Sequence, residues 1–297
     1  MSYEVELKLD IQEADIERFL TLAWLHSSQN LEQQPDRYLE NTYYDSPSFA
    51  LLENKAALRT RKAGERYYQT LKTKGSSVGG LHQRGEWEYP ISAPEGDNPP
   101  ALQPDLFPAD AWPSGVEVAD VVPIFTTNFA RKTWIWTSVR ASKVEIVLDK
   151  GHVSARKGQA AICEIELELL SGNPECLFDL AEAINLNIPL LISDVTKAQR
   201  GFDLLSPGRW TVFRESLESQ GTLNQLTAII QHLMDSELLP DALPDVALSL
   251  VNEGGLPAMD VLPWLLLTQS GKIDFSLRTQ WLLRLARHAW LLGNKDK

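Results

Sequence analysis

The sequence predicts an α+β protein in which a long strand-rich part precedes a smaller part made only of helices. Two observations lead to this prediction. Most of residues 1–170 alternates charged and apolar side chains with the period of two expected of β-strands, whose successive side chains point to opposite faces. From about residue 216, apolar residues recur at helical spacing instead. We therefore expect one domain at residues 1–205 and a small all-α domain at 216–297.

The first expected strand shows the alternation most clearly. It places Glu4, Glu6 and Lys8 on one face and Leu7 and Leu9 on the other. Later segments repeat this separation of charged and apolar faces. The expected strands lie at residues 3–10, 38–45, 56–62, 67–74, 82–91, 128–137, 142–150 and 160–170.

Helices and loops are expected between and after these strands. Residues 75–80 combine glycine and serine and predict a flexible loop. Residues 92–127 contain seven prolines and predict a surface excursion. The expected helices lie at residues 16–24, 174–186, 196–204, 223–234, 258–267 and 277–292.

Composition limits the classes of function. The chain has 297 residues, 43% of them apolar, and a net charge of −12, which argues against binding to nucleic acid or to an anionic membrane. No segment reaches the roughly 18 apolar residues of a membrane span, and the first residues have no signal-peptide pattern. Cys163 and Cys176 do not have metal-ligand spacing and are interpreted as reduced thiols. We expect a cytoplasmic protein.

The charged faces of the strands are the unusual feature of the sequence. An open antiparallel sheet often exposes one polar face to water, and that explanation suffices for any single strand. Rows of like charge, however, repel one another unless opposite charges lie between them. A closed or strongly curled sheet would instead direct these rows into a shared cavity. There, Arg and Lys would bind phosphate oxygens and carboxylates would bind a hard divalent cation, so a metal-bound triphosphate would satisfy both sets.

Several motifs in the same part of the chain resemble one family. The opening residues Glu4-Val5-Glu6-Leu7-Lys8 have the form ExExK. Further matches follow in order at 58–61 (LRTR), 70–72 (TLK), 80–84 (GLHQR), 145–149 (EIVLD), 164–172 (EIELELLSG) and 196–201 (TKAQRG). Together they resemble the CYTH superfamily, the triphosphate tunnel metalloenzymes, over about residues 1–205. The closest resemblance is to bacterial inorganic triphosphatases that carry a C-terminal CHAD domain.

This resemblance implies an eight-stranded antiparallel β-barrel that forms a tunnel, with flanking helices. It implies Mg²⁺ or Mn²⁺ as cofactor, with metal ligands among Glu4, Glu6, Glu164, Glu166 and Glu168. It implies phosphate contacts from Arg59, Arg61, Lys72, Arg84, Arg131, Lys197 and Arg200. Asp149 would assist the metal or orient water. Lys8 would lie near the attacking water as a positioning group or as a base, since a buried lysine among cations has a lowered pKa.

The implied activity is metal-dependent hydrolysis of inorganic triphosphate to diphosphate and phosphate. Two alternatives stay open: a thiamine triphosphatase or adenylate cyclase of the same superfamily, and a non-catalytic polyphosphate-binding module. Residues 285–293 resemble one CHAD helix, but residues 206–297 hold 8 Lys/Arg against 10 Asp/Glu, which argues against polyphosphate binding there. We interpret this part as a helical appendage. Tyr38, Tyr43, Tyr44 and the strand tryptophans are interpreted as packing residues.

Overall fold

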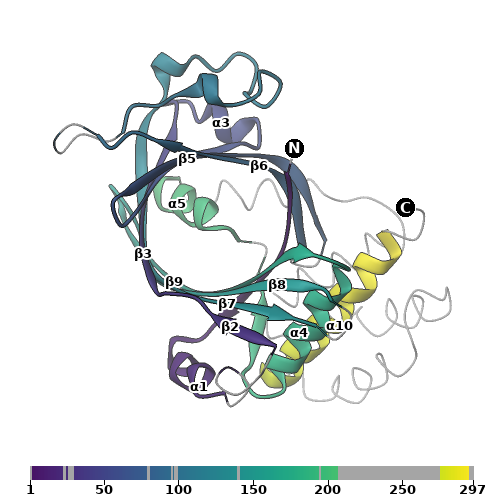
Figure 1. The fold of residues 1–297 in the computed structure, drawn as a ribbon. Helices are drawn as coiled ribbons and strands as arrows, with labels where there is room; N and C mark the ends of the chain where they lie inside the picture. Colours follow the sequence, from purple (N-terminus) through teal and green to yellow (C-terminus); the bar gives the residue numbers. More distant parts are fainter. Residues whose placement is uncertain are drawn as a thin grey trace.

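The fold is that of a closed β-barrel with helices on its outside and one helix within its ring (Figure 1). The computed structural model describes residues 2–22, 25, 30–78, 81–94, 96, 100–138, 141–193, 195–206 and 275–293. The strands are β1 (Ser2–Ile11), β2 (Leu31–Gln33), β3 (Arg37–Asp45), β4 (Ala57–Ala63), β5 (Arg66–Val78), β6 (Leu81–Ile91), β7 (Val122–Thr137), β8 (Lys143–Ala155), β9 (Gly158–Ser171) and β10 (Leu190–Ile192).

Eight of these strands close the barrel. They follow the order β1-β6-β5-β4-β3-β7-β8-β9, and β9 pairs back with β1. All of the pairings are antiparallel. The short strands β2 and β10 add to the outside of this ring through β7 and β1. The eight-stranded antiparallel barrel expected from the family resemblance is confirmed.

Helices occupy the connections. They are α1 (Ile16–Leu20), α3 (Ala50–Glu53), α4 (Glu175–Asn185), α5 (Lys197–Leu205) and α10 (Phe275–Gly293), with short 3-10 helices at Glu13–Asp15, Pro104–Leu106 and Val118–Asp120. The helices expected at 174–186, 196–204 and 277–292 are thus confirmed. The expected helices at 223–234 and 258–267 lie outside the described residues. Among the described residues, no helix is both long and apolar enough to cross a membrane.

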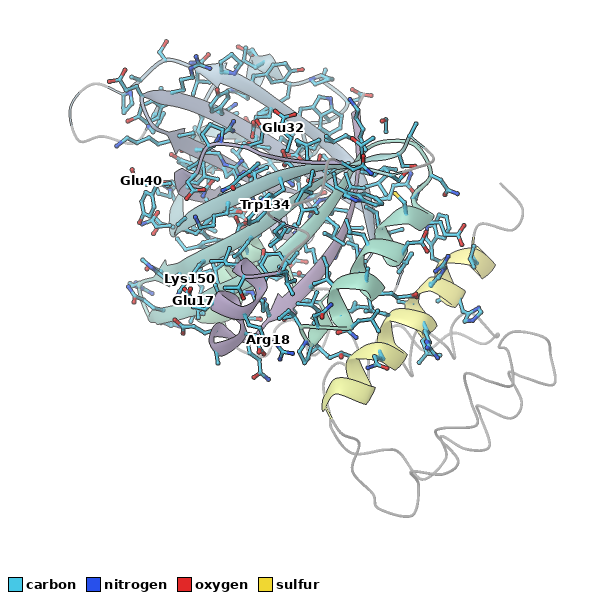
Figure 2. All side chains as sticks on the ribbon, turned by 60° about the horizontal axis from the view of Figure 1, so that its bottom comes forward. Glu17, Arg18, Glu32, Glu40, Trp134 and Lys150 are labelled. Atoms are coloured by element: carbon cyan, nitrogen blue, oxygen red, sulfur yellow. The ribbon has the colours of Figure 1, made fainter. Side chains whose placement is uncertain are left out.

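Alternation along each strand separates an apolar outer layer from a charged lumen. Leu7 and Leu9 of β1 are fully buried in an apolar cluster with Leu177 and Phe178 of α4 and Leu282 of α10. This layer also includes Trp134, whose ring meets that of Phe19 edge-on with centroids 5.9 Å apart. Figure 2 labels Trp134 among the strands. The outer helices therefore remove the apolar face of the barrel from water, as a period-2 pattern requires.

A second apolar cluster covers another part of the barrel's outside. Phe107, Ala111 and Val116, all from the proline-rich connection before β7, pack against Leu58 and Leu71. The surface excursion expected at 92–127 is therefore a cover for the apolar face of β4 and β5. Its last residues already belong to β7, which begins at Val122.

The flexible loop expected at residues 75–80 is wrong for its first part. Strand β5 continues to Val78 and pairs with β6, with a register shift between Lys72 and Gly75. Glycine and serine have low strand propensity, but the neighbouring strand supplies the backbone hydrogen bonds that propensity ignores. At Gly75, a Cβ atom would lie 2.1 Å from the backbone oxygen of Gln83. The glycine therefore permits a close approach of two strands.

Candidate functional site

The charged rows of separate strands meet inside the barrel. Lys72 Nζ of β5 lies 2.7 Å from Glu4 Oε1 of β1, although β6 separates these two strands. Arg131 of β7 reaches Glu166 of β9 across β8, with a nitrogen–oxygen distance of 3.0 Å. Although these pairs span an intervening strand, their side chains are at most 15% exposed, and the sheet closes through β1 and β9. These residues therefore face the lumen of the barrel and not bulk solvent.

The most buried part of the lumen is a cluster of three carboxylates. Oxygen atoms of Asp149, Glu164 and Glu166 lie within 4.8 Å of one another, and all three residues are buried. Arg131 contacts both oxygens of Asp149, at 2.8 and 2.7 Å. Lys197 Nζ lies 2.7 Å from Asp149 Oδ2 and 3.1 Å from Glu166 Oε1, and it also contacts Glu164. The cluster is therefore a dense network of opposite charges among buried side chains.

The carboxylates of this cluster do not ionise equally. Burial raises the pKa of Glu166, but the charges of Lys197, Lys8 and Arg131 outweigh burial and hold the pKa well below its usual range. For Glu164, burial and the charge of Glu166 dominate, so its pKa is raised despite the contact with Lys197. Glu166 is therefore ionised in the folded protein, and its negative charge lies at the centre of the network.

The expected lowered pKa of Lys8 is wrong. Lys8 is buried, which lowers its pKa, but Glu166 and Glu6 raise it by more, and the net pKa lies above the usual value. The sequence reasoning assumed cations around Lys8, whereas the barrel brings carboxylates there: Glu166 is in contact and Glu6 Oε2 is 3.2 Å away. Lys8 therefore stays protonated and can donate hydrogen bonds but cannot accept a proton, which favours the positioning role over the role of a base.

A second acidic group includes the other expected metal ligands. Glu4 contacts Lys72 and Arg84, and Glu6 Oε1 lies 2.6 Å from an Arg84 nitrogen. Glu168 is the cross-strand neighbour of Glu6. Among the described residues, the side chain of Glu168 has no hydrogen bond or ion pair. Burial, followed by the charge of Glu4, raises the pKa of Glu168 to about 7.

Two expected phosphate contacts come from α5, which lies within the ring of strands in Figure 1. The helix begins with a capping box, in which Thr196 and Gln199 each bind the backbone of the other. Lys197 and Arg200 follow directly, and Arg200 lies 2.7 Å from Asp10 and 3.6 Å from Glu164. The cap thus fixes the turn that places two cations beside the buried carboxylates.

The remaining expected phosphate contacts, Arg59 and Arg61, lie on adjacent inward positions of β4. Arg59 is 3.5 Å from Glu86 and 3.8 Å from Glu88, and Arg61 is 3.9 Å from Glu88. These contacts are longer than those of Arg131 or Arg84. Burial and the charges of Arg59 and Arg131 lower the pKa of Arg61 to about 10. All of the expected site residues therefore face the lumen, but the expected metal ligands fall into two groups instead of one.

Sequence reasoning did not recognise two lumen residues that lie opposite these arginines. Asn41 was not singled out. The packing interpretation of Tyr43 is confirmed by its burial and its stack on Phe125, but Tyr43, like Asn41, faces the lumen from β3. The same alternation that selected Arg59 and Arg61 would have placed positions 41 and 43 on one face. The packing interpretation is wrong for Tyr38, whose exposed fraction is 56%.

Comparison with known proteins agrees with this architecture. The family model of the CYTH domain matches residues 2–202. The chain belongs to the CYTH domain family. A curated relative, the inorganic triphosphatase of Haemophilus influenzae, is 35% identical over 205 residues, which are 68% of this chain and 55% of the relative. This CYTH chain thus matches only about half the length of that relative.

Solved structures show weaker likeness to this CYTH chain. HpAC1 from Hippeastrum, a protein with dominant triphosphatase activity, is 17% identical at a TM-score of 0.44, with 72% of this chain and 96% of HpAC1 covered. The PH1819 protein from Pyrococcus horikoshii is 19% identical at a TM-score of 0.39, with 62% and 89% covered. The fold assignment therefore rests on the strand pairings and the family match.

Proposed function

We propose that this CYTH chain hydrolyses inorganic triphosphate to diphosphate and phosphate inside the barrel, with Mg²⁺ or Mn²⁺ as cofactor. The observation that carries the proposal is the convergence of cations from β4, β5, β6, β7 and α5 on one buried lumen. A linear triphosphate offers several anionic oxygens over a short length, which matches a lumen lined by guanidinium and ammonium groups. The curated triphosphatase relative supports the same activity.

The carboxylates fit a hard divalent ion. Mg²⁺ and Mn²⁺ prefer oxygen ligands, and the lumen offers them in two groups. Around Glu168, burial and the charge of Glu4 raise the pKa to about 7, so a bound cation would stabilise the ionised carboxylate. Glu4, Glu6 and Glu168 would hold an ion at one end of the carboxylate row, and Glu164 and Glu166 would extend the set. When bound, the ion supplies positive charge that stabilises the developing charge on the phosphoryl oxygens.

The side chains of the lumen would position the triphosphate and stabilise its negative charge. Arg59, Arg61 and Lys72 would hold phosphate oxygens, and Lys197 and Arg131 would do so beside the carboxylate cluster. Lys8, held protonated by its carboxylate neighbours, would donate to the attacking water or to a terminal phosphoryl oxygen. Because these groups are fixed by ion pairs before substrate arrives, little reorganisation accompanies the reaction.

A phosphate-release screen tests the proposal. Purified protein is assayed with inorganic triphosphate, ATP, thiamine triphosphate and a long polyphosphate, each with Mg²⁺, with Mn²⁺ or with EDTA. We expect the highest kcat/KM for inorganic triphosphate and no turnover in EDTA. A preference for thiamine triphosphate or ATP would assign the alternative enzymes of the superfamily, and saturable binding with no released phosphate would assign a binding module.

The variant Glu4→Gln/Glu6→Gln connects this activity to the lumen. It should lose metal-dependent turnover by about a hundredfold or more, because each residue contributes a metal ligand in the proposal. Glu40→Gln is the control, since Glu40 is an exposed glutamate of β3 that pairs with Lys62 on the outside. Full activity of the double variant would remove Glu4 and Glu6 from the site.

A further inference from the structure

The lumen holds its cations in two different ways. Carboxylates contact Lys8, Lys197 and Arg131 closely, so much of their charge is cancelled within the protein. On β4, by contrast, the carboxylate contacts of Arg59 and Arg61 are 3.5 Å or longer. Two uncharged side chains of β3 lie opposite these arginines instead: Asn41 opposite Arg61 and Tyr43 opposite Arg59.

Asn41 is the partner of Arg61. The two residues lie directly opposite each other in the β3–β4 register. Asn41 is 1% exposed, and its amide nitrogen donates to the backbone oxygen of Thr127 at 3.0 Å and to the hydroxyl of Thr127 at 3.1 Å. Its amide oxygen accepts a hydrogen bond from Arg61 Nε at 2.8 Å. Because Thr127 fixes the nitrogen side of the amide, the oxygen can only point toward Arg61.

Tyr43 is the partner of Arg59 at the next inward position of the same strand. These residues also lie directly opposite each other. Tyr43 is buried, and its ring stacks on Phe125 with centroids 4.7 Å apart. Burial raises the pKa of its hydroxyl, but the nearby positive charge of Arg59 outweighs burial and lowers that pKa. Phe125 in turn meets Phe202 of α5 edge-on at 5.3 Å. The tyrosine ring is therefore fixed by packing on Phe125, which in turn packs on Phe202 of the inner helix.

A neutral partner and a carboxylate have different consequences for an arginine. Both fix the direction of the guanidinium group, but only the carboxylate cancels its charge. Burial and the charges of Arg59 and Arg131 lower the pKa of Arg61 to about 10. This shift reflects the local surplus of positive charge around Arg61. A multiply charged anion relieves that surplus. An arginine with a neutral partner is thus both oriented and available.

We propose that Asn41 and Tyr43 are positioning residues that aim Arg61 and Arg59 at the phosphates of the substrate without themselves cancelling the charge of either arginine. The inference rests on the proposed function, because triphosphate is the anion in question. It assigns a role in the binding of substrate to two residues that do not themselves carry charge.

The decisive variant is Asn41→Asp, which keeps the shape of the side chain and adds a negative charge opposite Arg61. We expect KM for triphosphate with Mg²⁺ to rise about tenfold while kcat stays within about twofold, the pattern of lost uniform binding. The new carboxylate pairs with Arg61 but can no longer donate to the backbone oxygen of Thr127, so Tm is expected to fall, and the split between KM and kcat is the deciding measurement. Tyr43→Phe, which removes only the hydroxyl, should raise KM about threefold on the same grounds. Asn187→Asp is the matched control, an exposed asparagine in the turn after α4.

A purely structural role predicts something else: Asn41→Asp would then lower kcat and leave KM unchanged. That result, or a KM equal to that of Asn187→Asp, would overturn the inference. If wild-type protein releases no phosphate, the proposed hydrolysis fails, and calorimetric binding of triphosphate then tests the positioning role separately. Weaker binding by Asn41→Asp than by Asn187→Asp supports it, whereas equal binding, or none by the wild type, overturns it.

Discussion

Asp149 and Lys150 are neighbours in β8, yet they experience opposite environments. Asp149 points into the lumen, is fully buried and contacts Arg131 and Lys197 at 2.7 Å. Lys150 points outward, and its side chain is 52% exposed while it pairs with Glu13 at 3.1 Å. Figure 2 labels Lys150 beside Glu17 of α1. Ion pairs of similar length therefore differ in strength on the two faces, because water screens the exposed outer pair strongly and the buried inner pair only weakly.

The largest effect should follow from removing the centre of the inner network. Glu166→Gln leaves Lys8, Lys197 and Arg131 with one fewer negative partner in a buried site. We expect a loss of about 3–5 kcal/mol in the free energy of unfolding. We expect phosphate release to fall about a hundredfold or more. Urea unfolding and the phosphate assay measure the two quantities.

A second variant keeps this prediction testable if Glu166→Gln fails to fold. Glu164→Gln should have the same effects in a milder form, because the pKa of Glu164 is raised and its carboxyl is less firmly ionised in the native protein. If Glu164→Gln costs more stability and activity than Glu166→Gln, then Glu166 is not the centre of the network.

The next effect concerns pH and isolates Glu168. Its folded-state pKa of about 7 lies above the ordinary value of 4.5, so the folded protein binds this proton more tightly than the unfolded chain does. The resulting stabilisation is fully present below pH 4.5 and is lost as pH rises through about 7. In EDTA, Glu168→Gln should therefore lose less stability than wild type between about pH 5 and pH 8. Urea midpoints that change in parallel for both proteins would contradict this assignment.

The contrast between the faces was partly visible in the sequence. Alternation on β1 correctly separated Glu6 and Lys8 from Leu7 and Leu9, because side-chain period is a local property of any strand. Closure of the sheet is not local: β9 follows β1 by more than a hundred residues, and only their pairing determines which face becomes the lumen. The pKa of Lys8 was misjudged for the same reason, since its neighbours come from that pairing. The pattern alone could equally describe an open sheet.

A smaller effect should appear where α10 packs on the outside of the barrel. Arg287 of α10 contacts Glu175 of α4 and lies 2.9 Å from Asp179 and 3.7 Å from Glu182. Its side chain is 26% exposed, so Arg287→Ala should cost about 1 kcal/mol in the free energy of unfolding. Phosphate release should stay at the wild-type level, because α10 contacts the outer face and not the lumen. A severalfold loss of kcat would show that this outer contact is coupled to the site.

The smallest effect should come from the outer pair of Lys150 and Glu13. Their side chains are 52% and 69% exposed, so each charge is already well solvated when the pair is broken. Glu13→Gln should therefore change neither the urea midpoint nor kcat/KM by a measurable amount, and high salt should not alter that result. Glu166→Gln removes the same kind of charge from the lumen and is predicted to be severe. If the two substitutions proved comparable in cost, burial inside the barrel would not be what distinguishes functional charges from surface charges in this protein.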